Sequence, residues 1–554
     1  MSAWSAGAIV VMGFVGCEAP ETGKCQEGYV RDDAGRCAGV AAAADDSGEP
    51  EVPPPVDTGG SEPDSRFAVG ERIACDAPLT SVTYTDVAAE WGLTSPAVVP
   101  TEHSENGAVA VADFDLDGDL DVVLGFLGEP AVMYTREGDG FEKSHLPGQD
   151  GITQLGMADV DSDGRLDLLT GGFEPQVLLN LSTGWTVIDF PISPMADETS
   201  VTKSIHPMDI DRDGHQDAYV LMSALETSGD AGMDTIAWGA GDGTFTLDTG
   251  VVPSLWGHQK GFDVQWFDWD ADGWQDVYVV NELSLPGAKS TDRNEANFFL
   301  RNNNGALELA NDECGCSLQH DGMGAALGDY NNDGRPDLYL TATGKNVLLA
   351  QLEDQTYVDV GQSTGADTLD GTIASMAWGS VMVDIDNDGL LDVAVAEGDL
   401  WHEFTEDAIV ADMPFNVRRQ VEAGRYENAN AMGFGQMGSW RTVVPADHNG
   451  DGILDFVVGE VEQRPLLLLS DGCTANNWLQ VAAPHGSRVE IDVGEQTRTA
   501  WANTASSFGG VAEPVAHFGL GAATEVREIR VQLPDGESLL LADTVQARRR
   551  ITVH

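Results

Sequence analysis

Hydrophobic positions in this chain fall in short runs of three to five residues, separated by acidic loops. Ala108–Ala112 and Val122–Leu124 flank one such loop, and Val277–Val280 and Leu338–Leu340 follow two others. Short runs rich in β-branched and aromatic residues are typical of β-strands rather than helices. The pattern therefore predicts an all-β chain in which each acidic loop joins two strands.

The loops share one motif, D-x-[DN]-x-D-G-x-x-D, which occurs seven times at intervals of 46 to 63 residues. The copies begin at Asp113, Asp159, Asp209, Asp268, Asp329, Asp384 and Asp447. A period in this range indicates a propeller, a solenoid or an array. A second, weaker hairpin follows each motif, for example Val177–Asn180 with Trp185–Ile188, so each repeat has about four strands. We therefore predict a seven-bladed β-propeller, because a parallel β-helix would need much shorter repeats of fixed length.

The spacing of oxygen atoms in the motif favours Ca²⁺, a hard cation that takes six to eight oxygen ligands. Carboxylates at positions 1, 3 and 5 of a tight loop can point to one centre, and the glycine at position 6 permits a sharp turn. Position 7 would offer its backbone carbonyl, and the aspartate at position 9 would close the site. The motifs thus predict up to seven Ca²⁺ sites. The predicted ligands are Asp113, Asp115, Asp117, Asp119, Asp121, Asp159, Asp161, Asp163, Arg165, Asp167, Asp209, Asp211, Asp213, His215, Asp217, Asp268, Asp270, Asp272, Trp274, Asp276, Asp329, Asn331, Asp333, Arg335, Asp337, Asp384, Asp386, Asp388, Leu390, Asp392, Asp447, Asn449, Asp451, Ile453 and Asp455.

Two other interpretations of the motif fit the sequence less well. An EF-hand needs a glutamate at position 12 and helices on both sides, whereas position 12 is Thr170 in the second copy and Leu or Val in the others. A solvated acidic turn would explain a single motif but not seven copies in register. Asn331 and Asn449 replace aspartate at position 3, and their side-chain carbonyls still offer an oxygen ligand.

The formal net charge of −64 over 554 residues limits the classes of partner that the protein can bind. So acidic a surface repels nucleic acid and anionic lipid headgroups, and we expect no nucleic-acid partner.

The first 66 residues differ from the repeats in composition. Residues 8–17 form an apolar run that ends in Gly16-Cys17 and is too short to span a membrane. The run resembles a secretory signal with a bacterial lipobox, which predicts a signal segment at 1–17, lipidation of Cys17 and export to the cell surface, the outer membrane or the medium. Any membrane contact would then occur through this lipid anchor. Residues 18–66 contain cysteines and a proline-rich, low-complexity stretch that is typical of a disordered linker.

Seven cysteines are present, and lipidation of Cys17 would leave six. Cys25 and Cys37 could close a small loop. Cys314 and Cys316 could form a local bridge or stay reduced. No second pair or suitable histidine completes a zinc site with them.

The phase of the repeats predicts how the ring closes. Tyr84–Val87 matches Tyr357–Val360, the outer strand of the blade that carries the fifth motif, whereas the last blade ends at Leu466–Leu469 without a fourth strand. We therefore expect the N-terminal strand to complete the last blade. This closure would bring Cys75 and Cys473 together as a disulfide.

No common catalytic motif is present: the sequence contains no G-x-S-x-G, H-E-x-x-H or P-loop. His258 near Trp256 and Lys260, and His402 after Trp401, could line a polysaccharide site. The alternative function is therefore a calcium-dependent polysaccharide lyase or hydrolase, or an accessory protein of a biosynthetic cluster.

The repeats resemble FG-GAP (VCBS-type) repeats, which also form integrin α-subunit propellers. Asn477–Val481, His517–Gly521 and Ile529–Gly536 resemble an ASPIC/UnbV domain. Because it combines these repeats with this domain, the chain resembles the cartilage-acidic-protein family in its bacterial form. The resemblance implies an integrin-α-like propeller at residues 80–472 and a small C-terminal β domain at 476–554. It also implies an exported, non-enzymatic adhesion or interaction module, whose protein or carbohydrate partner binds the propeller face away from the calcium loops.

Overall fold

The computed structural model describes residues 29–31, 37–39, 66–94, 107–126, 129–148, 151–172, 174–191, 200–224, 234–248, 261–281, 296–367, 376–398, 413–461, 465–503 and 505–554. The chain divides into two compact units, Met1–Ser61 and Glu62–His554. In the first unit, β1 (Tyr29–Arg31) pairs with β2 (Cys37–Gly39). The second unit contains all the structure described below.

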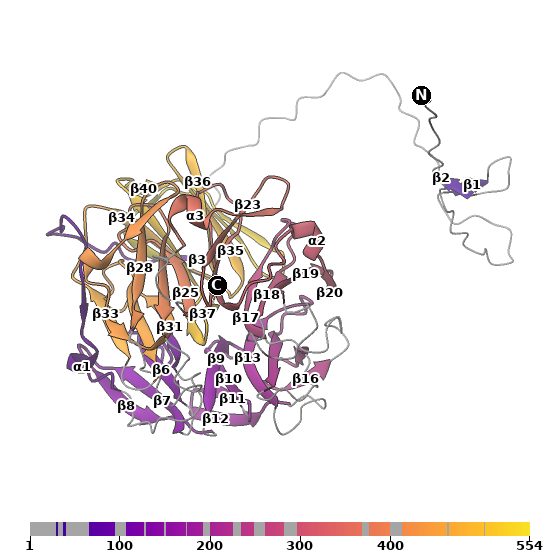
Figure 1. Cartoon of the computed structure of the whole chain (residues 1–554), viewed down its shortest axis with the longest axis horizontal. Helices are drawn as coiled ribbons and strands as arrows, with labels where there is room; N and C mark the ends of the chain where they lie inside the picture. The colour runs from indigo at the N-terminus through magenta and orange to yellow at the C-terminus, as the bar shows by residue number, and fades with distance from the viewer. Residues whose placement is uncertain are drawn as a thin grey trace, which may run out of the picture. The chain divides into compact units, whose positions relative to one another are not determined.

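Strand pairing within the described residues gives seven four-stranded antiparallel units, or blades (Figure 1). The first three blades are β5 (Ala108–Ala112), β6 (Asp121–Phe126), β7 (Glu129–Arg136) and β8 (Phe141–His145); β9 (Ile152–Ala158), β10 (Asp167–Gly172), β11 (Gln176–Leu181) and β12 (Gly184–Asp189); and β13 (Ser200–Met208), β14 (Asp217–Ala224), β15 (Thr235–Gly239) and β16 (Phe245–Asp248). The next two are β17 (Gly261–Phe267), β18 (Asp276–Asn281), β19 (Phe298–Asn303) and β20 (Ala306–Leu309); and β21 (Gly322–Gly328), β22 (Asp337–Ala342), β23 (Val347–Gln351) and β24 (Tyr357–Asp359). The last two are β25 (Ala377–Val383), β26 (Asp392–Glu397), β28 (Asn416–Glu422) and β29 (Arg425–Asn428); and β31 (Trp440–Ala446), β32 (Asp455–Glu460), β33 (Leu466–Ser470) and β4 (Tyr84–Asp86). Shorter elements near the blades are α1 (Ala88–Trp91), α2 (Asn311–Cys314), α3 (Gly361–Thr364), a 3₁₀ turn (Asn430–Met432), β27 (Met413–Pro414) and β30 (Met437–Gly438).

The blades form a ring. The first strand of each blade contacts the first strand of the next, in the order β5, β9, β13, β17, β21, β25 and β31, and β31 contacts β5 in turn. The inner strands are buried on both faces, which explains why Ala108–Ala112 is a continuous apolar run rather than an alternating one. Hydrophobic clusters fill the spaces between neighbouring blades; one of them joins Val111 and Val122 of the first blade to Val444 and Leu467 of the last. This arrangement confirms the all-β propeller predicted from the sequence.

The ring closes through the N-terminal strand, as the repeat phase predicts. β4 pairs antiparallel with β33, with Tyr84 opposite Ser470. The Tyr84 hydroxyl donates a hydrogen bond of 3.1 Å to the Leu454 carbonyl, and Tyr357 makes the matching bond to Pro336 in the fifth blade. Cys75 and Cys473 form a disulfide with their Cα atoms 5.9 Å apart.

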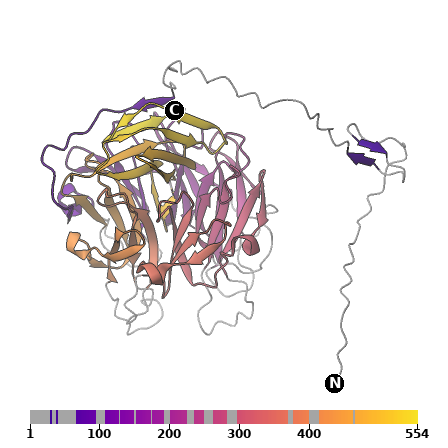
Figure 2. The same ribbon diagram turned by 90° about the horizontal axis from the view of Figure 1, so that it is seen from above.

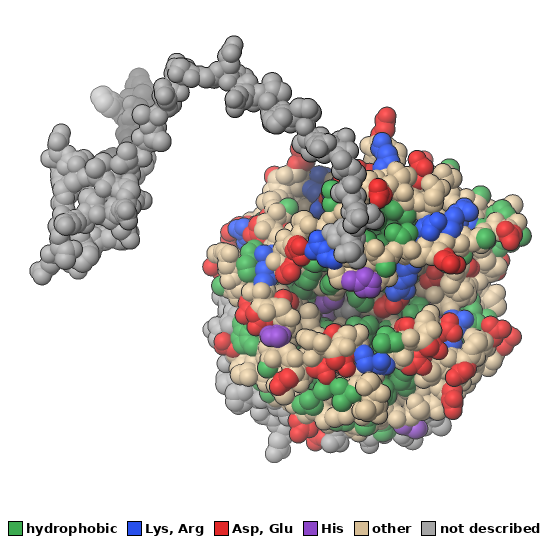
Figure 3. Space-filling view, turned by 180° about the vertical axis from the view of Figure 1, so that it is seen from behind, with side chains coloured by type: hydrophobic (Ala, Val, Ile, Leu, Met, Phe, Trp, Pro, Cys, Tyr) green, Lys and Arg blue, Asp and Glu red, His purple; other side chains and the backbone are tan. Residues whose placement is uncertain are grey.

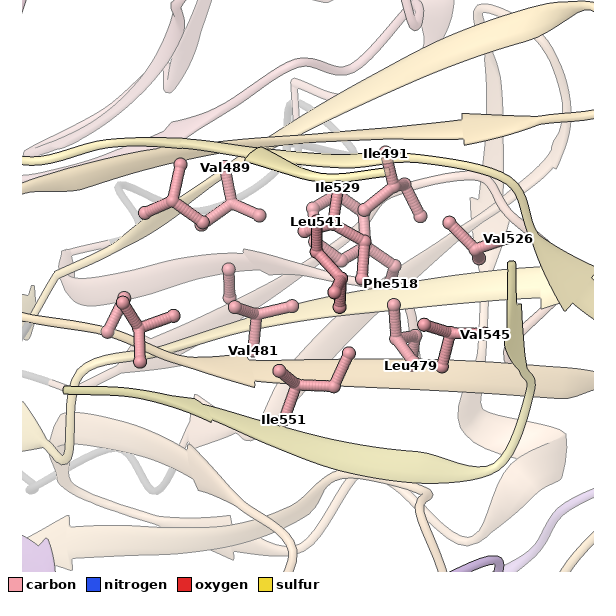
Figure 4. Close-up of a cluster of buried hydrophobic side chains, with 14 of the residues drawn as sticks. Leu479, Val481, Val489, Ile491, Phe518, Val526, Ile529, Leu541, Val545 and Ile551 are labelled. Atoms are coloured by element: carbon pink, nitrogen blue, oxygen red, sulfur yellow. The ribbon is translucent and has the colours of Figure 1, made fainter. Parts of the chain in front are cut away.

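The C-terminal residues fold into a β-sandwich on the propeller (Figure 2). One sheet has the order β3 (Phe67–Val69), β44 (Arg549–Val553), β34 (Asn477–Ala482) and β39 (Val515–Gly521); the other has the order β36 (Gln496–Ala502), β35 (Ser487–Val493), β41 (Ile529–Gln532) and β42 (Ser538–Leu541). β40 (Glu525–Val526) pairs with β43 (Val545–Gln546). Figure 4 shows the core between the sheets, where Leu479 and Val481 meet Ile491, Phe518 and Ile529.

A hairpin of the C-terminal domain enters the propeller channel. It consists of β37 (Ala505–Ser507) and β38 (Gly510–Ala512), and β38 pairs in parallel with the inner strand β5. The hairpin contacts the inner strands β9, β21, β25 and β31 as well. Phe508 at its turn is 1% exposed and packs against Phe262 and Trp378. The hairpin therefore plugs the ring from the end on which the C-terminal domain sits.

Candidate cation sites in the seven acidic loops

Each acidic loop joins the first strand of a blade to the second, and all seven have nearly the same backbone. The position-1 aspartate accepts a hydrogen bond of 2.7 to 3.1 Å from the amide of the position-6 glycine in every loop. These glycines have φ between +83° and +98°, a conformation that costs glycine little. The position-5 aspartate accepts a hydrogen bond from the position-7 amide in every loop. The conformation of each loop is therefore stabilised by hydrogen bonds between its own backbone amides and its own side chains.

Position 4 of each loop also has a left-handed backbone, which the motif does not reveal. Its φ lies between +56° and +70° in all seven copies. The residues are Leu116, Ser162, Arg212, Ala271, Asn332, Asn387 and Gly450. Glycine and asparagine adopt this conformation readily, whereas a bulky residue such as leucine is strained in it.

Replacing Leu116 by asparagine is therefore expected to stabilise the protein. Leu116 has φ +65° and its side chain is 57% exposed, so the substitution relieves backbone strain and removes little buried contact. We expect a gain of about 0.5–1 kcal/mol in the free energy of unfolding, measured by chemical denaturation. A Leu116→Ala variant is the control, since alanine shortens the side chain without favouring this conformation. Equal stability of the two variants would contradict the backbone explanation.

The position-9 aspartate fastens each loop to its blade. In the first loop, one carboxylate oxygen of Asp121 accepts a hydrogen bond from the backbone amide of Phe114 at position 2. The other oxygen accepts a hydrogen bond from the backbone amide of Arg136 on β7. The same pair of bonds recurs in the other six loops. Position 9 is therefore both a candidate ligand and a structural clamp, which explains why it is aspartate in all seven copies.

Carboxylates at positions 1, 3 and 9 converge in five of the loops. In each of these five, one oxygen or more of every member lies within 4.8 Å of the others. The groups are Asp113, Asp115 and Asp121; Asp159, Asp161 and Asp167; Asp209, Asp211 and Asp217; Asp268, Asp270 and Asp276; and Asp384, Asp386 and Asp392. Oxygens bound to one Ca²⁺ lie at most about 5 Å apart, because each bond is about 2.3–2.6 Å long. The spacing therefore fits a single cation in each loop. The other two loops have Asn331 and Asn449 at position 3.

Several oxygens in the loops are buried without a hydrogen-bond partner. They are Oδ1 of Asp209 at position 1 of the third loop, Oδ1 of Asp386 at position 3 of the sixth, and Oδ1 of Asp447 at position 1 of the seventh. A buried carboxylate oxygen without a partner is costly. A cation bound in the loop would supply the missing partner, so the residues present fit the group.

Burial and mutual repulsion raise the pKa values of these carboxylates. Desolvation raises the pKa of Asp121, Asp167 and Asp217 to about 7 and that of Asp276 to about 8; neighbouring loop carboxylates add to the rise, and hydrogen bonds from backbone amides oppose it. The ionised form is therefore disfavoured unless positive charge is supplied nearby. A divalent cation would supply that charge.

Three loops differ from the others because an arginine pairs with a carboxylate at position 3 or position 5. Arg335 of the fifth loop pairs with Asp333. Arg301 contacts Asp270 and Asp272 in the fourth loop. Arg419 lies 2.6 Å from Asp386 and 3.0 Å from Asp388 in the sixth loop. The guanidinium groups already neutralise part of the negative charge there, so we expect these loops to attract a cation less strongly.

Side chains of one blade reach the loop of the previous blade. Asn180, Asn302, Gln351 and Gln420 each donate to the position-2 carbonyl of the preceding loop, over 2.7 to 3.1 Å. Tyr84 does the same to Ile385 at the closure. The loops are thus tied to the contacts between blades, and a cation that fixes one loop would also fix the blade beside it.

The C-terminal domain covers the loop face, which sequence reasoning did not foresee. His517 Nε2 lies 2.7 Å from Asn387 Oδ1, and Gln480 Nε2 donates to Asp447 Oδ2 over 3.1 Å. Arg488 donates to the Gly334 carbonyl in the fifth loop. A side chain at Gly519 would collide with Asp384. A partial signal was present in β35, where Arg488, Glu490 and Asp492 alternate with apolar residues.

Other predicted residues are placed as follows. Cys314 and Cys316 form a disulfide and are fully buried. The side chains of Cys17, Cys25 and Cys37 lie outside the described residues. The same holds for the candidate polysaccharide-binding residues Trp256, His258, Lys260, Trp401 and His402.

Comparison with known proteins agrees with this architecture. A model described as FG-GAP-like repeat matches residues 113–170, 209–279 and 329–395, and one described as ASPIC and UnbV matches residues 481–554. Cartilage acidic protein 1 of Xenopus tropicalis is 24% identical over 474 residues, which cover 69% of this chain and 70% of that protein. Its counterpart in Mus musculus is 24% identical over 503 residues, which cover 80% and 73%. This chain combines FG-GAP-like repeats with an ASPIC/UnbV domain and is similar in sequence to cartilage acidic protein 1. Six of the seven motifs fall within the matched repeats, and the motif that starts at Asp447 lies outside them.

Solved structures with a similar chain path include BBS1N in complex with ARL6DN, with a TM-score of 0.41 and 11% identity over 71% of this chain and 99% of that one. The Dos1 propeller has a TM-score of 0.39 and 11% identity over 64% and 76%. In the part of this chain that the structure describes, no helix has the length and apolar character needed to cross a membrane.

Proposed function

We propose that this protein is a calcium-dependent interaction module in which up to seven Ca²⁺ ions hold the blades of the propeller in place. The observation that carries the proposal is the convergence of carboxylates at positions 1, 3 and 9 within 4.8 Å of one another, repeated in five loops. The buried, unpartnered oxygens of Asp209, Asp386 and Asp447 support it. Asn331 and Asn449 can contribute amide oxygens in the remaining two loops.

The role of the cation in this proposal is structural. Each loop is tied by hydrogen bonds to its own blade and to the next, so bound ions stiffen the ring and present a rigid surface. The hairpin around Phe508 occupies part of the channel at the loop end, which restricts access for a substrate from that side. Both features favour a non-enzymatic role over polysaccharide cleavage.

The partner in this proposal is a protein or carbohydrate outside the cell. The Cys75–Cys473 disulfide suits an oxidising compartment, and Asp and Glu side chains, with Lys and Arg among them, are spread over the face seen in Figure 3. Because the C-terminal domain covers the loop face, the partner would bind elsewhere on the molecule.

Calcium stoichiometry tests the proposal. Isothermal titration of metal-free protein is expected to show between five and seven sites, with the fourth, fifth and sixth loops filling last because of Arg301, Arg335 and Arg419. Arg419→Gln should strengthen binding in the sixth loop, and Arg418→Gln, on the neighbouring residue of the same strand, is the matched control. Binding of one ion or none would refute the calcium role.

A further inference from the structure

A buried hydrogen bond joins the propeller and the C-terminal domain at the seventh loop. Gln480 of β34 is 5% exposed, and its amide meets the carboxylate of Asp447, the position-1 residue of that loop. The other oxygen of Asp447 is buried and has no hydrogen-bond partner. A buried amide therefore lies directly beside a carboxylate that has one buried oxygen without a hydrogen-bond partner.

Gln480 stands in a row of polar residues that crosses three strands of the C-terminal sheet. Its neighbours across the sheet are His517 on β39 and Arg550 on β44. Leu479 and Val481, on the opposite face of β34, lie in the sandwich core. Since His517 contacts the sixth loop, the whole row faces the loop end of the propeller.

The seventh loop has one carboxylate fewer than most of the others, because Asn449 stands at position 3. Asp447, Asn449 and Gln480 line a cavity of about 380 Å³ between the domains, together with Asp113 and Asp119 of the first loop and with Arg136 and Arg550. That volume holds a cation together with water ligands, since one water occupies about 30 Å³ in the liquid. A cation there would need an additional oxygen ligand, and Gln480 is close enough to provide it.

We propose that the cation site of the seventh loop is shared between the domains, with the side-chain oxygen of Gln480 as a ligand. Glutamine side-chain carbonyls are ordinary Ca²⁺ ligands. A half-turn of the terminal amide brings Oε1 to the place where Nε2 now donates to Asp447. The inference rests on the proposed function, and it adds that calcium in this loop fastens the C-terminal domain and its channel hairpin to the propeller.

Substitution of Gln480 tests the shared site in two directions. Gln480→Met keeps the length of the side chain but removes the oxygen, and we expect about tenfold weaker binding at one site. Gln480→Glu supplies the missing carboxylate, and we expect about tenfold tighter binding at that site. Gln532→Met is the matched control: Gln532 belongs to the same domain and its amide lies close to Gly273 of the fourth loop, but the structure shows it bonded to no loop carboxylate.

Terbium luminescence and hydrogen exchange provide two readouts on the full chain. The Trp478 ring lies against Gly452 of the seventh loop, so it should sensitise Tb³⁺ bound there; the difference between the wild type and Trp478→Phe isolates this site. Amide exchange of residues 505–512 reports docking of the hairpin. We expect Gln480→Met to lose the sensitised emission at low Tb³⁺ and to exchange faster at subsaturating Ca²⁺.

The outcomes separate this inference from the calcium role itself. If the wild type binds Ca²⁺ but both Gln480 variants bind and exchange like Gln532→Met, the shared site is refuted and the calcium role stands. If the wild type binds no cation, both proposals fail. Opposite shifts in Gln480→Met and Gln480→Glu would support the shared site, because a general loss of folding could not tighten binding in one of them.

Discussion

Chelation of calcium with EGTA is expected to lower the free energy of unfolding by about 10 kcal/mol and the melting midpoint by about 10 °C. With free Ca²⁺ at about ten times an extracellular-type dissociation constant, each occupied site contributes about 1.4 kcal/mol. The loss should be large because the loops place buried carboxylates such as Asp121 and Asp276 close to others of the same charge. Differential scanning calorimetry in EGTA and in about 2 mM Ca²⁺ measures it.

Because the formal charge of the chain is −64, Ca²⁺ could also stabilise the protein by general screening of charge repulsion. This effect must be separated from binding of Ca²⁺ at the loops. NaCl at matched ionic strength is the control: it weakens repulsion between exposed charges but does not coordinate the loops. We expect NaCl to recover only a small part of the midpoint and Ca²⁺ to recover all of it. An identical melting midpoint in EGTA and in Ca²⁺ would refute the proposed structural role of the cation.

Replacing Cys75 by serine is expected to cost about 5 kcal/mol of stability. The Cys75–Cys473 bridge spans 398 residues, and in the chain-entropy model a longer closed loop restricts the unfolded chain more. The bridge also holds the segment that leads into β4, whose pairing with β33 completes the last blade. Urea denaturation under non-reducing conditions gives the difference.

The double variant Cys75→Ser with Cys473→Ser is the control for this prediction. Either single substitution already opens the bridge, so the double variant should lose no more stability than the single ones. Limited proteolysis before β4 should become faster in all three variants. An unchanged denaturation midpoint in Cys75→Ser would show that strand pairing alone closes the ring.

The propeller could be predicted because the motif fixes both the phase and the period of each repeat. Asp113 directly follows the apolar run Ala108–Ala112, which indicated that the loop lies between two strands. The sequence match between Tyr84–Val87 and Tyr357–Val360 predicted the strand that closes the ring. Convergence of positions 1, 3 and 9 also followed from the spacing. Local spacing carries this information because ligand geometry and strand alternation are local properties.

Long-range contacts could not be predicted in the same way. Nothing near Phe67–Val69 in the sequence reveals that this strand pairs with Arg549–Val553 at the other end of the chain. Gln480 looked like an ordinary polar residue on a strand, and only the docked sheet places it beside Asp447. The left-handed backbone at Leu116 was also hidden, because leucine is an unusual choice for it.

The channel hairpin has a consequence for biosynthesis. A nascent chain emerges from the ribosome with its N-terminus first, yet β4 can pair only after β33 has been made, and the hairpin at 505–512 follows later still. Until β33 has been made, β4 has no partner strand, and the unclosed ring has open strand edges that invite pairing with other chains. Closure of the ring is therefore a late event in synthesis, and the growing chain needs protection from aggregation until β4 has paired with β33.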